Sequence, residues 1–183
     1  MMQGLQAMKD SAALLVYWDG EASDISWPEP CIVEYVTNGQ GGINSMSKEA
    51  VNAMIADQDM SVHDLISIGN IRKKYPPQTS TEKTVMQTVI GDMMSVYPSE
   101  SYGIIFGSHG SGWLPTITGT RSIGQDGGRY SSDTALIPEL AEVLRTVNPQ
   151  KFDFVLFDAC MMGCAEVYYE LEGCCQILHR FCT

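Results

Sequence analysis

The chain has 183 residues, of which 44% are hydrophobic and 18% charged, the composition of an ordinary globular protein. This length suffices for one domain with one core, so we expect residues 1–183 to form a single domain. The net charge of −11 argues against partners such as nucleic acid or an anionic membrane, because phosphate contacts need a basic face. No apolar run is long enough to span a membrane, and the first 10 residues lack the apolar stretch of a signal peptide.

Six cysteines, at positions 31, 160, 164, 174, 175 and 182, invite a disulfide or metal-site interpretation that their spacing does not favour. Four of the six fall in the last 20 residues of the chain. Cys160 and Cys164 lack both the CxxC spacing and the neighbouring histidine of a zinc site. We therefore expect no metal centre among them.

Two short apolar runs near the start of the chain, residues 12–17 and 31–36, predict buried strands, each followed by a turn signal with glycine. Residues 47–57 have the pattern of a short helix. Residues 61–68 are mixed and are compatible with a strand or an insertion. A Tyr-Pro-Pro segment at residues 75–77 then interrupts the chain.

A longer helix follows, with Ser80 or Thr81 as its cap and Pro98 as its end. Apolar residues recur between these positions at helical spacing: Val85, Val89, Met93 and Val96. Residues 102–106 predict a strand that is apolar on both faces, as in the middle of a parallel sheet. The loop after it, residues 107–112, is rich in Gly and Ser, and residues 119–132 predict an exposed loop.

The remaining predicted elements continue the alternation of strands and helices. Residues 135–147 predict a helix with Pro138 in its first turn, and residues 152–157 predict a buried strand. A last helix is expected to begin near Met161 and to end near Leu171. This order predicts an α/β fold, a parallel sheet with helices on both faces, in which reactive groups gather at the carboxyl ends of the strands.

His109 and Cys160 follow two of the predicted strands. A cysteine nucleophile must be exposed, ionisable near neutral pH and within reach of a base. The helix expected beside Cys160 would stabilise its thiolate, and the backbone N–H groups of Gly110 and Cys160 are placed to form an oxyanion hole. Taken singly, a cysteine after a strand is more often an inert buried thiol. Its placement together with a histidine favours a catalytic pair.

Two motifs then carry a specific resemblance. Residues 108–113 read Ser-His-Gly-Ser-Gly-Trp, and residues 157–163 read Phe-Asp-Ala-Cys-Met-Met-Gly, followed by Glu166 and by Tyr-Glu-Leu at residues 169–171. The histidine lies 51 residues before the cysteine (160 − 109), close to the spacing of about 50 in caspases. The chain resembles the clostripain family of clan CD cysteine peptidases.

The resemblance implies a caspase-like fold, a three-layer α/β sandwich whose mostly parallel sheet is flanked by helices and is incomplete at the C-terminus. It also implies a cysteine endopeptidase that cuts peptides or proteins after Arg or Lys through His109 and Cys160. Asp158 matches the acidic residue of the family's Asp-Ala-Cys motif, which contributes to a pocket for a basic side chain. The same residue type is equally suited to cap the following helix.

Further expectations come from the same resemblance. Family members are often cut between the two motifs, and Arg121, in the predicted exposed loop, is the candidate self-cleavage site. The chemistry requires no cofactor. Some members respond to calcium, although no cluster of oxygen ligands at a recognisable spacing marks a calcium site here. The resemblance suggests a bacterial protein that is exported or held in the cell envelope.

Residues 172–183 depart from the family pattern because they are rich in cysteine and lack the expected continuation. With one allowed codon choice, reading this segment one base later gives Lys-Asp-Val-Ala-Arg-Tyr-Phe-Ile-Gly-Ser-Ala, which extends the helix and enters an apolar strand. We therefore expect an aberrant, frameshifted tail and a missing C-terminal fragment. Different codons in the encoding DNA would refute this hypothesis.

Two other functions stay open at this point. The chain is alternatively a catalytically silent, truncated remnant of such a peptidase. A flavodoxin-like module that binds a small molecule is less favoured, because residues 107–112 have neither the GxGxxG nor the P-loop pattern.

Overall fold

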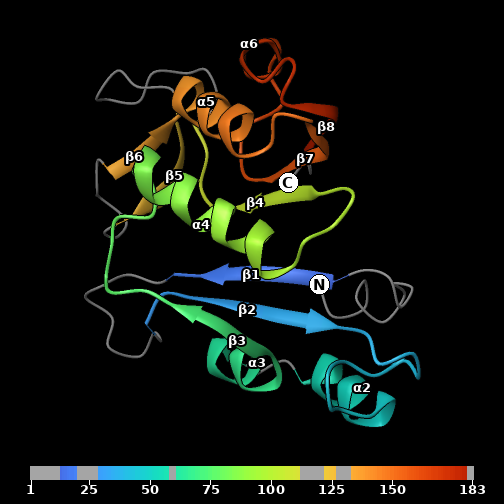
Figure 1. Cartoon of the computed structure of the whole chain (residues 1–183). Coiled ribbons are helices and arrows are strands. Elements are labelled where there is room, and N and C mark those ends of the chain that lie inside the picture. Colours follow the sequence, from blue (N-terminus) through green and yellow to red (C-terminus); the bar gives the residue numbers. More distant parts are fainter. Residues whose placement is uncertain (1–12, 20–28, 58–60, 112–121, 127–132, 181–183) are drawn as a thin grey trace. The chain divides into compact units, whose positions relative to one another are not determined.

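The computed structural model describes residues 13–19, 29–57, 61–111, 122–126 and 133–180. By its internal contacts the chain divides into two units, Met1–Gln78 and Thr79–Thr183. Figure 1 labels the helices and strands of both units. The second unit carries both predicted catalytic residues.

The first unit is built on a three-stranded antiparallel sheet in the order β1-β2-β3. Strands β1 (Ala13–Trp18) and β2 (Cys31–Val36) confirm the two predicted strands. They pair antiparallel with each other, so they are not part of the parallel arrangement in the predicted, mostly parallel sheet. The 12 residues between them, 19–30, contain two prolines and no helical apolar stripe, a sequence that disfavours the crossover helix that parallel strands need.

Two helices and the third strand complete this unit. Helix α2 (Lys48–Ala56) is as predicted, whereas the mixed residues 61–68 form a helix, α3 (Val62–Ile68). Ser61 starts α3 with a capping box, since its Oγ accepts a hydrogen bond from the Asp64 N–H at 3.2 Å and its own N–H donates to the Asp64 carboxylate at 2.9 Å. Strand β3 (Asn70–Lys74) has one apolar residue and no alternation, so the sequence did not predict it.

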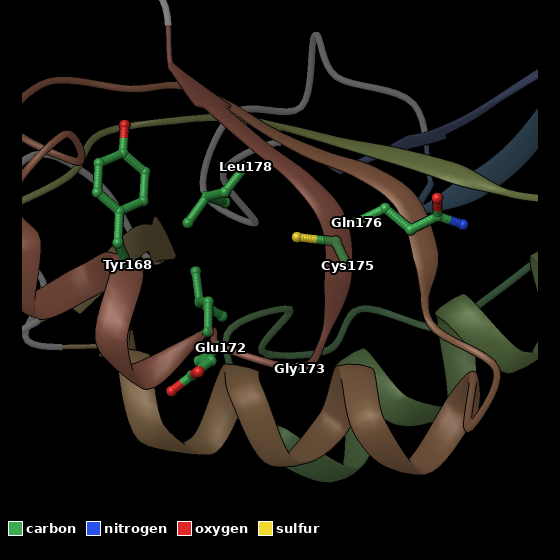
Figure 2. Close-up of a pocket in the computed structure, with 7 residues that line it drawn as sticks. Tyr168, Glu172, Gly173, Cys175, Gln176 and Leu178 are labelled. Carbon is green, nitrogen blue, oxygen red and sulfur yellow. The ribbon is translucent and has the colours of Figure 1, made fainter.

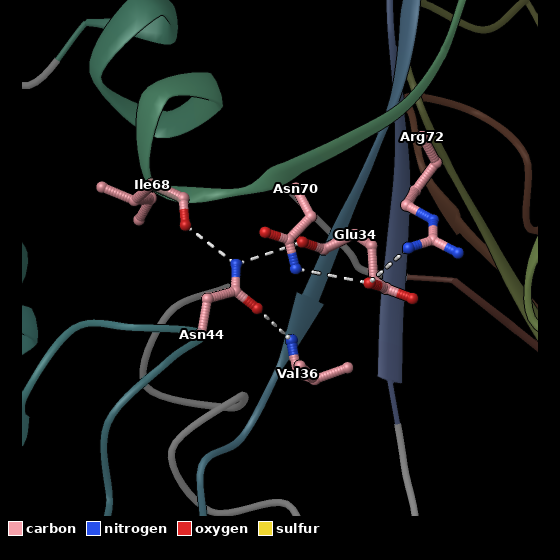
Figure 3. Close-up of polar contacts among 6 residues, drawn as sticks. All are labelled: Glu34, Val36, Asn44, Ile68, Asn70 and Arg72. Atoms are coloured by element: carbon pink, nitrogen blue, oxygen red, sulfur yellow. Dashed lines mark hydrogen bonds and ion pairs between the residues drawn. The ribbon is translucent and has the colours of Figure 1, made fainter.

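Asn44 ties the end of β2 to the junction between α3 and β3 (Figure 3). Its amide group donates to the carbonyls of Glu34 and Ile68 at 3.2 and 2.8 Å, and its Oδ1 accepts from the Val36 N–H at 3.0 Å. Val36 lies beyond the last residue pair of β2 and β3. The Asn44 side chain therefore accepts the hydrogen bond from the Val36 N–H where β3 offers no partner. Asn44 has a φ of 51°, a left-handed conformation that asparagine tolerates better than most residues.

The carboxylate of Glu34 explains why a strand with so few apolar residues pairs with β2. The side chain is largely buried, and a buried carboxylate without partners is costly. It accepts a hydrogen bond from Asn70 at 3.4 Å and lies 3.7 Å from the Arg72 guanidinium (Figure 3). Both partners come from β3, so polar contacts complement the backbone ladder there.

The second unit contains a parallel sheet in the order β4-β7-β8. Its strands are β4 (Gly103–Gly107), β7 (Phe152–Asp158) and β8 (Cys175–Arg180). Helices α4 (Lys83–Val96), α5 (Ile137–Val147) and α6 (Ala165–Glu170) share one buried core with these strands. The α/β class and the parallel sheet flanked by helices are as predicted. The core includes Ile90, Leu140, Leu144, Val155, Phe157 and Val167.

The sheet of this unit also has a face that exposes large apolar side chains. Ile105, Phe154 and Ile177 are 55%, 38% and 61% exposed. Phe154 and Ile177 are register partners, and Val155, which follows Phe154, is fully buried. The alternation along β7 is the one expected of a strand with one face in the core.

Several boundaries differ from the predicted ones. Helix α4 is preceded by Glu82, which makes no capping hydrogen bond, rather than being capped by Ser80 or Thr81. Residues 133–136 form β6 (Asp133–Leu136), so α5 begins two residues later than predicted, with proline in its first turn as expected. Within the predicted exposed loop, residues 122–126 form β5 (Ser122–Asp126), which pairs antiparallel with β6.

Strand β8 lies within residues 172–183, the predicted aberrant tail. It pairs in parallel with β7, with Phe154 opposite Ile177 and Leu156 opposite His179. The segment as given therefore forms a strand at the edge of the described sheet. Its origin in a frameshift stays a prediction.

Candidate active site

The candidate site lies where β4 and β7 end. The two strands are parallel neighbours, in a register that pairs Gly107 with Asp158. The contact continues one residue further, since the Ser108 N–H donates to the Asp158 carbonyl at 3.3 Å. His109 and Cys160 each follow at the second residue after the strand end. The parallel register thus brings both predicted catalytic residues to the same edge of the sheet.

Gly110 is where the two loops meet. A Cβ at this position would lie 2.6 Å from the Cys160 carbonyl oxygen and 3.0 Å from the Cγ and Sδ atoms of Met162. A side chain at residue 110 would therefore push the two loops apart. Glycine is required here because of the close approach, and the loop that carries His109 rests directly on the turn that carries Cys160.

The two candidate catalytic side chains are exposed, whereas two of the residues near Cys160 are buried. His109 and Cys160 are both exposed. Ala159 and Met162, on either side of Cys160, are buried. The thiol and the imidazole are thus open to a substrate, and the backbone that carries the thiol is fixed by its buried neighbours.

The helix expected to start beside Cys160 starts later. Helix α6 begins at Ala165, with Cys164 as its N-cap. Met161 has a φ of 61°, a left-handed conformation that cannot continue into a right-handed helix. The prediction that a helix N-terminus stabilises the Cys160 thiolate is therefore wrong.

Strand β5 holds the His109 loop from a second direction. The Gly124 N–H donates to the His109 carbonyl at 2.8 Å, and Gly110 forms an antiparallel bridge with Ile123. Ile123 is 3% exposed and belongs to the core of this unit. Sequence reasoning missed β5 because Ser-Ile-Gly-Gln-Asp contains a single apolar residue, too few to show a strand pattern.

Asp158 is the last residue of β7 and is exposed. It does not cap a helix, because the N-cap of α6 is Cys164. Of the two roles that the sequence left open for Asp158, only the contact with a basic substrate side chain therefore stays open. Arg121, the candidate self-cleavage residue, lies outside the described residues.

Cys174 is buried and Cys175 half-buried, in contrast to the exposed Cys160. Burial raises the pKa of the Cys174 and Cys175 thiols, which keeps them protonated and weakly nucleophilic. In the part of the chain that the structure describes, no group of three or more His, Cys, Asp or Glu side chains could hold a metal ion. None of the described helices is long and apolar enough to span a membrane.

A shallow pocket of about 370 Å³ lies between α6 and β8 (Figure 2). Figure 2 shows the side chains of Tyr168 and Leu178 at one side of it and the Cys175 thiol directed into it. None of the residues predicted for catalysis lines this pocket. It is therefore separate from the edge of the sheet where His109 and Cys160 lie.

The fold and the site define an α/β protein that presents an exposed histidine and an exposed cysteine at the ends of adjacent parallel strands. The model of the clostripain family, peptidase C11, matches residues 1–178. The chain belongs to the clostripain family. No match was found among curated proteins.

Two solved structures are similar to this chain. One is a secreted C11 cysteine protease from Bacteroides thetaiotaomicron in complex with an irreversible peptide inhibitor, with 31% identity and a TM-score of 0.63. The other, a secreted C11 cysteine protease from the same organism called iotapain, has 16% identity and a TM-score of 0.65, a likeness in fold alone. The matches cover 95% and 97% of this chain but 40% and 44% of those chains. This chain thus spans less than half the length of either structure.

The close approach at Gly110 leads to a stability prediction. Gly110→Ala should lower the free energy of unfolding by about 1–3 kcal/mol, because the new methyl group overlaps the Cys160 carbonyl oxygen. Gly107→Ala is the matched control, since a Cβ there would meet nothing within 4 Å, and its effect should stay within about 0.5 kcal/mol. Urea unfolding measures both. Equal midpoints for the two variants would contradict the contact between the loops.

Proposed function

We propose that this chain is the histidine- and cysteine-bearing part of a cysteine endopeptidase that cleaves peptide bonds after Arg or Lys. The observation that carries the proposal is the exposure of His109 and Cys160 on neighbouring strand ends in a chain of the clostripain family. The relative at 31% identity is a cysteine protease bound to a peptide inhibitor, which supports peptides and proteins as substrates here.

The proposed reaction has two halves. The Cys160 thiolate attacks the scissile carbonyl carbon, a C–S bond forms, and the carbonyl electrons move onto oxygen. The backbone N–H groups of Gly110 and Cys160 donate hydrogen bonds to this oxyanion. When the intermediate collapses, the C–N bond breaks and His109 gives a proton to the leaving amine. Water then hydrolyses the thioester, which releases the carboxylic acid and restores the cysteine.

In this scheme His109 serves more as the acid for the leaving group than as the base in a tight thiolate–imidazolium pair. The support is the contact between the two loops, which meet where Gly110 approaches the Cys160 carbonyl oxygen. The exposure of both side chains leaves room for the peptide between them. Asp158, at the end of the strand that leads to Cys160, is the proposed partner of the Arg or Lys side chain.

Calcium, export and a further fragment belong to the same proposal. Calcium rests on the family resemblance alone. Export rests on the secreted relative. A further C-terminal fragment is proposed because both solved relatives are more than twice as long as the matched part.

Peptide cleavage tests the activity. Fluorogenic peptides ending in Arg, Lys, Asp or Leu are offered to the chain as given and to a longer, frame-restored version, with and without EDTA. Cleavage after Arg and Lys should vanish in Cys160→Ala and fall about 10²–10⁴-fold in His109→Ala, while Cys164→Ala, a control thiol at the N-cap of α6, keeps it.

The outcomes separate the alternatives. Activity in the longer version alone means that His109 and Cys160 are correctly assigned and that this chain is an inactive, truncated form of the peptidase. Silence in both versions, together with no labelling of Cys160 by an Arg-directed electrophile, favours the catalytically silent remnant. Loss of activity with EDTA alone would support calcium.

Substitution of Asp158 tests the specificity. Asp158→Asn should lower kcat/KM for Arg and Lys peptides about tenfold to a hundredfold, because a charge-assisted hydrogen bond is lost, and should leave uncharged peptides unaffected. Asp153→Asn is the matched control, since Asp153 is near the other end of the same strand and bonds Gln176. An equal fall for Leu and Arg peptides would refute a role for Asp158 in specificity.

Self-cleavage after Arg121 is tested by intact mass. The purified active chain should consist of two fragments, Arg121→Gln should stay in one piece, and Cys160→Ala should do the same because it lacks the nucleophile. A wild-type mass equal to that of Cys160→Ala, apart from the substitution itself, would end this proposal.

A further inference from the structure

Met162 connects the turn that carries Cys160 to the core of the second unit. It lies two residues after Cys160 and is 0% exposed. It belongs to the same buried core cluster as Ile123 of β5 and Val155 and Phe157 of β7. Its Cγ and Sδ atoms also lie 3.0 Å from the place where a Cβ of Gly110 would be. The side chain is thus packed between the core and the loop that carries His109.

The His109 loop is held on two sides by these contacts. On one side, the His109 carbonyl accepts from the Gly124 N–H and Gly110 bridges Ile123. On the other side, Gly110 rests on Met162 and on the Cys160 carbonyl oxygen. A displacement of Met162 would therefore change the separation of the two loops, while β5 would keep the His109 loop in place.

No regular structure fixes the turn itself. Strand β7 ends at Asp158 and helix α6 does not begin until Ala165. Between them Met161 is left-handed and 51% exposed, so it makes little contribution to the packing. Among the residues directly after Cys160, Met162 is the buried one that holds the turn.

We infer that Met162 is a positioning residue, which sets the place of the Cys160 thiol relative to His109 by packing against Gly110. This inference rests on the proposed peptidase function for its catalytic meaning. A misplacement of reacting groups by 1 Å can cost about 10²-fold in rate, so a residue that touches neither substrate nor thiol can still control the chemical step. Met162 acts on the turn after β7, whereas Asp158 lies on the strand, so substrate binding should change less than turnover.

The first experiment is a set of core substitutions with a matched control. Met162→Ala should lower kcat about tenfold or more with KM within about threefold. Met162→Leu conserves the volume and should retain most of kcat. Met94→Ala is the control, since Met94 is partly buried against the same core but lies on α4. Near-UV circular dichroism and Tm establish that each variant is folded at the assay temperature.

A second measurement does not need peptidase activity. Iodoacetamide alkylates Cys160, and mass spectrometry of the Cys160-containing peptide gives its rate separately from the other thiols. The rate is measured in a double-mutant cycle of His109→Ala and Met162→Ala. Because a histidine near a thiol favours the thiolate even without a tight pair, we expect His109→Ala to lower the rate about two- to tenfold in the presence of Met162 and by a smaller factor in its absence.

The two experiments distinguish a failure of the positioning role from a failure of the proposed peptidase function. A non-additive cycle in a chain that cleaves no peptide would support the positioning role and count against the peptidase. An additive cycle, including one in which His109→Ala has no effect in either background, would overturn the positioning role. So would a folded Met162→Ala variant whose kcat matches that of Met94→Ala.

Discussion

The site depends on one steric condition, the close approach of Gly110 to the Cys160 carbonyl and to Met162. The parallel register of β4 and β7 makes the approach unavoidable, because it brings the two loops to the same level at the edge of the sheet. A residue larger than glycine would separate the loops, and the histidine and cysteine would then lose their common position. The strands therefore bring the two residues to one edge, and the glycine determines how closely their loops approach.

The candidate catalytic side chains are exposed, and their backbones are held by buried neighbours. Ala159, directly before Cys160, and Met162, two residues after it, are both buried. Ile123 of β5 forms a bridge with Gly110 in the loop that carries His109. This separation of roles is compatible with catalysis, since a nucleophile must be accessible while its geometry stays fixed. Cys174 and Cys175 show the opposite case, because burial raises the pKa of both thiols and disfavours the nucleophilic thiolate.

The sheet of the first unit is stabilised partly by polar side-chain contacts. Its sheet is antiparallel, and the polar contacts of Asn44 and Glu34 complete the hydrogen bonding where the strand ladder stops. Because an unpaired backbone or carboxylate group is costly when buried, these contacts remove a cost that apolar packing alone would leave in the sheet. The family match includes this unit, since it extends over residues 1–178.

The sequence by itself determined the elements with a strong apolar pattern and singled out the two candidate residues of the site. The strand before His109 is an apolar run, and the one before Cys160 is interrupted only by Asp153. Helices α2, α4 and α5 have a helical stripe, so local sequence and tertiary packing agree in these elements. Only the tertiary structure decided the short elements, namely β3, β5 and the late start of α6. Strand β3 is stabilised by partners on β2, β5 by the burial of Ile123, and the start of α6 is delayed by the left-handed Met161. Each of these depends on contacts between residues distant in sequence or on a single backbone angle, and neither leaves a periodic pattern in the chain.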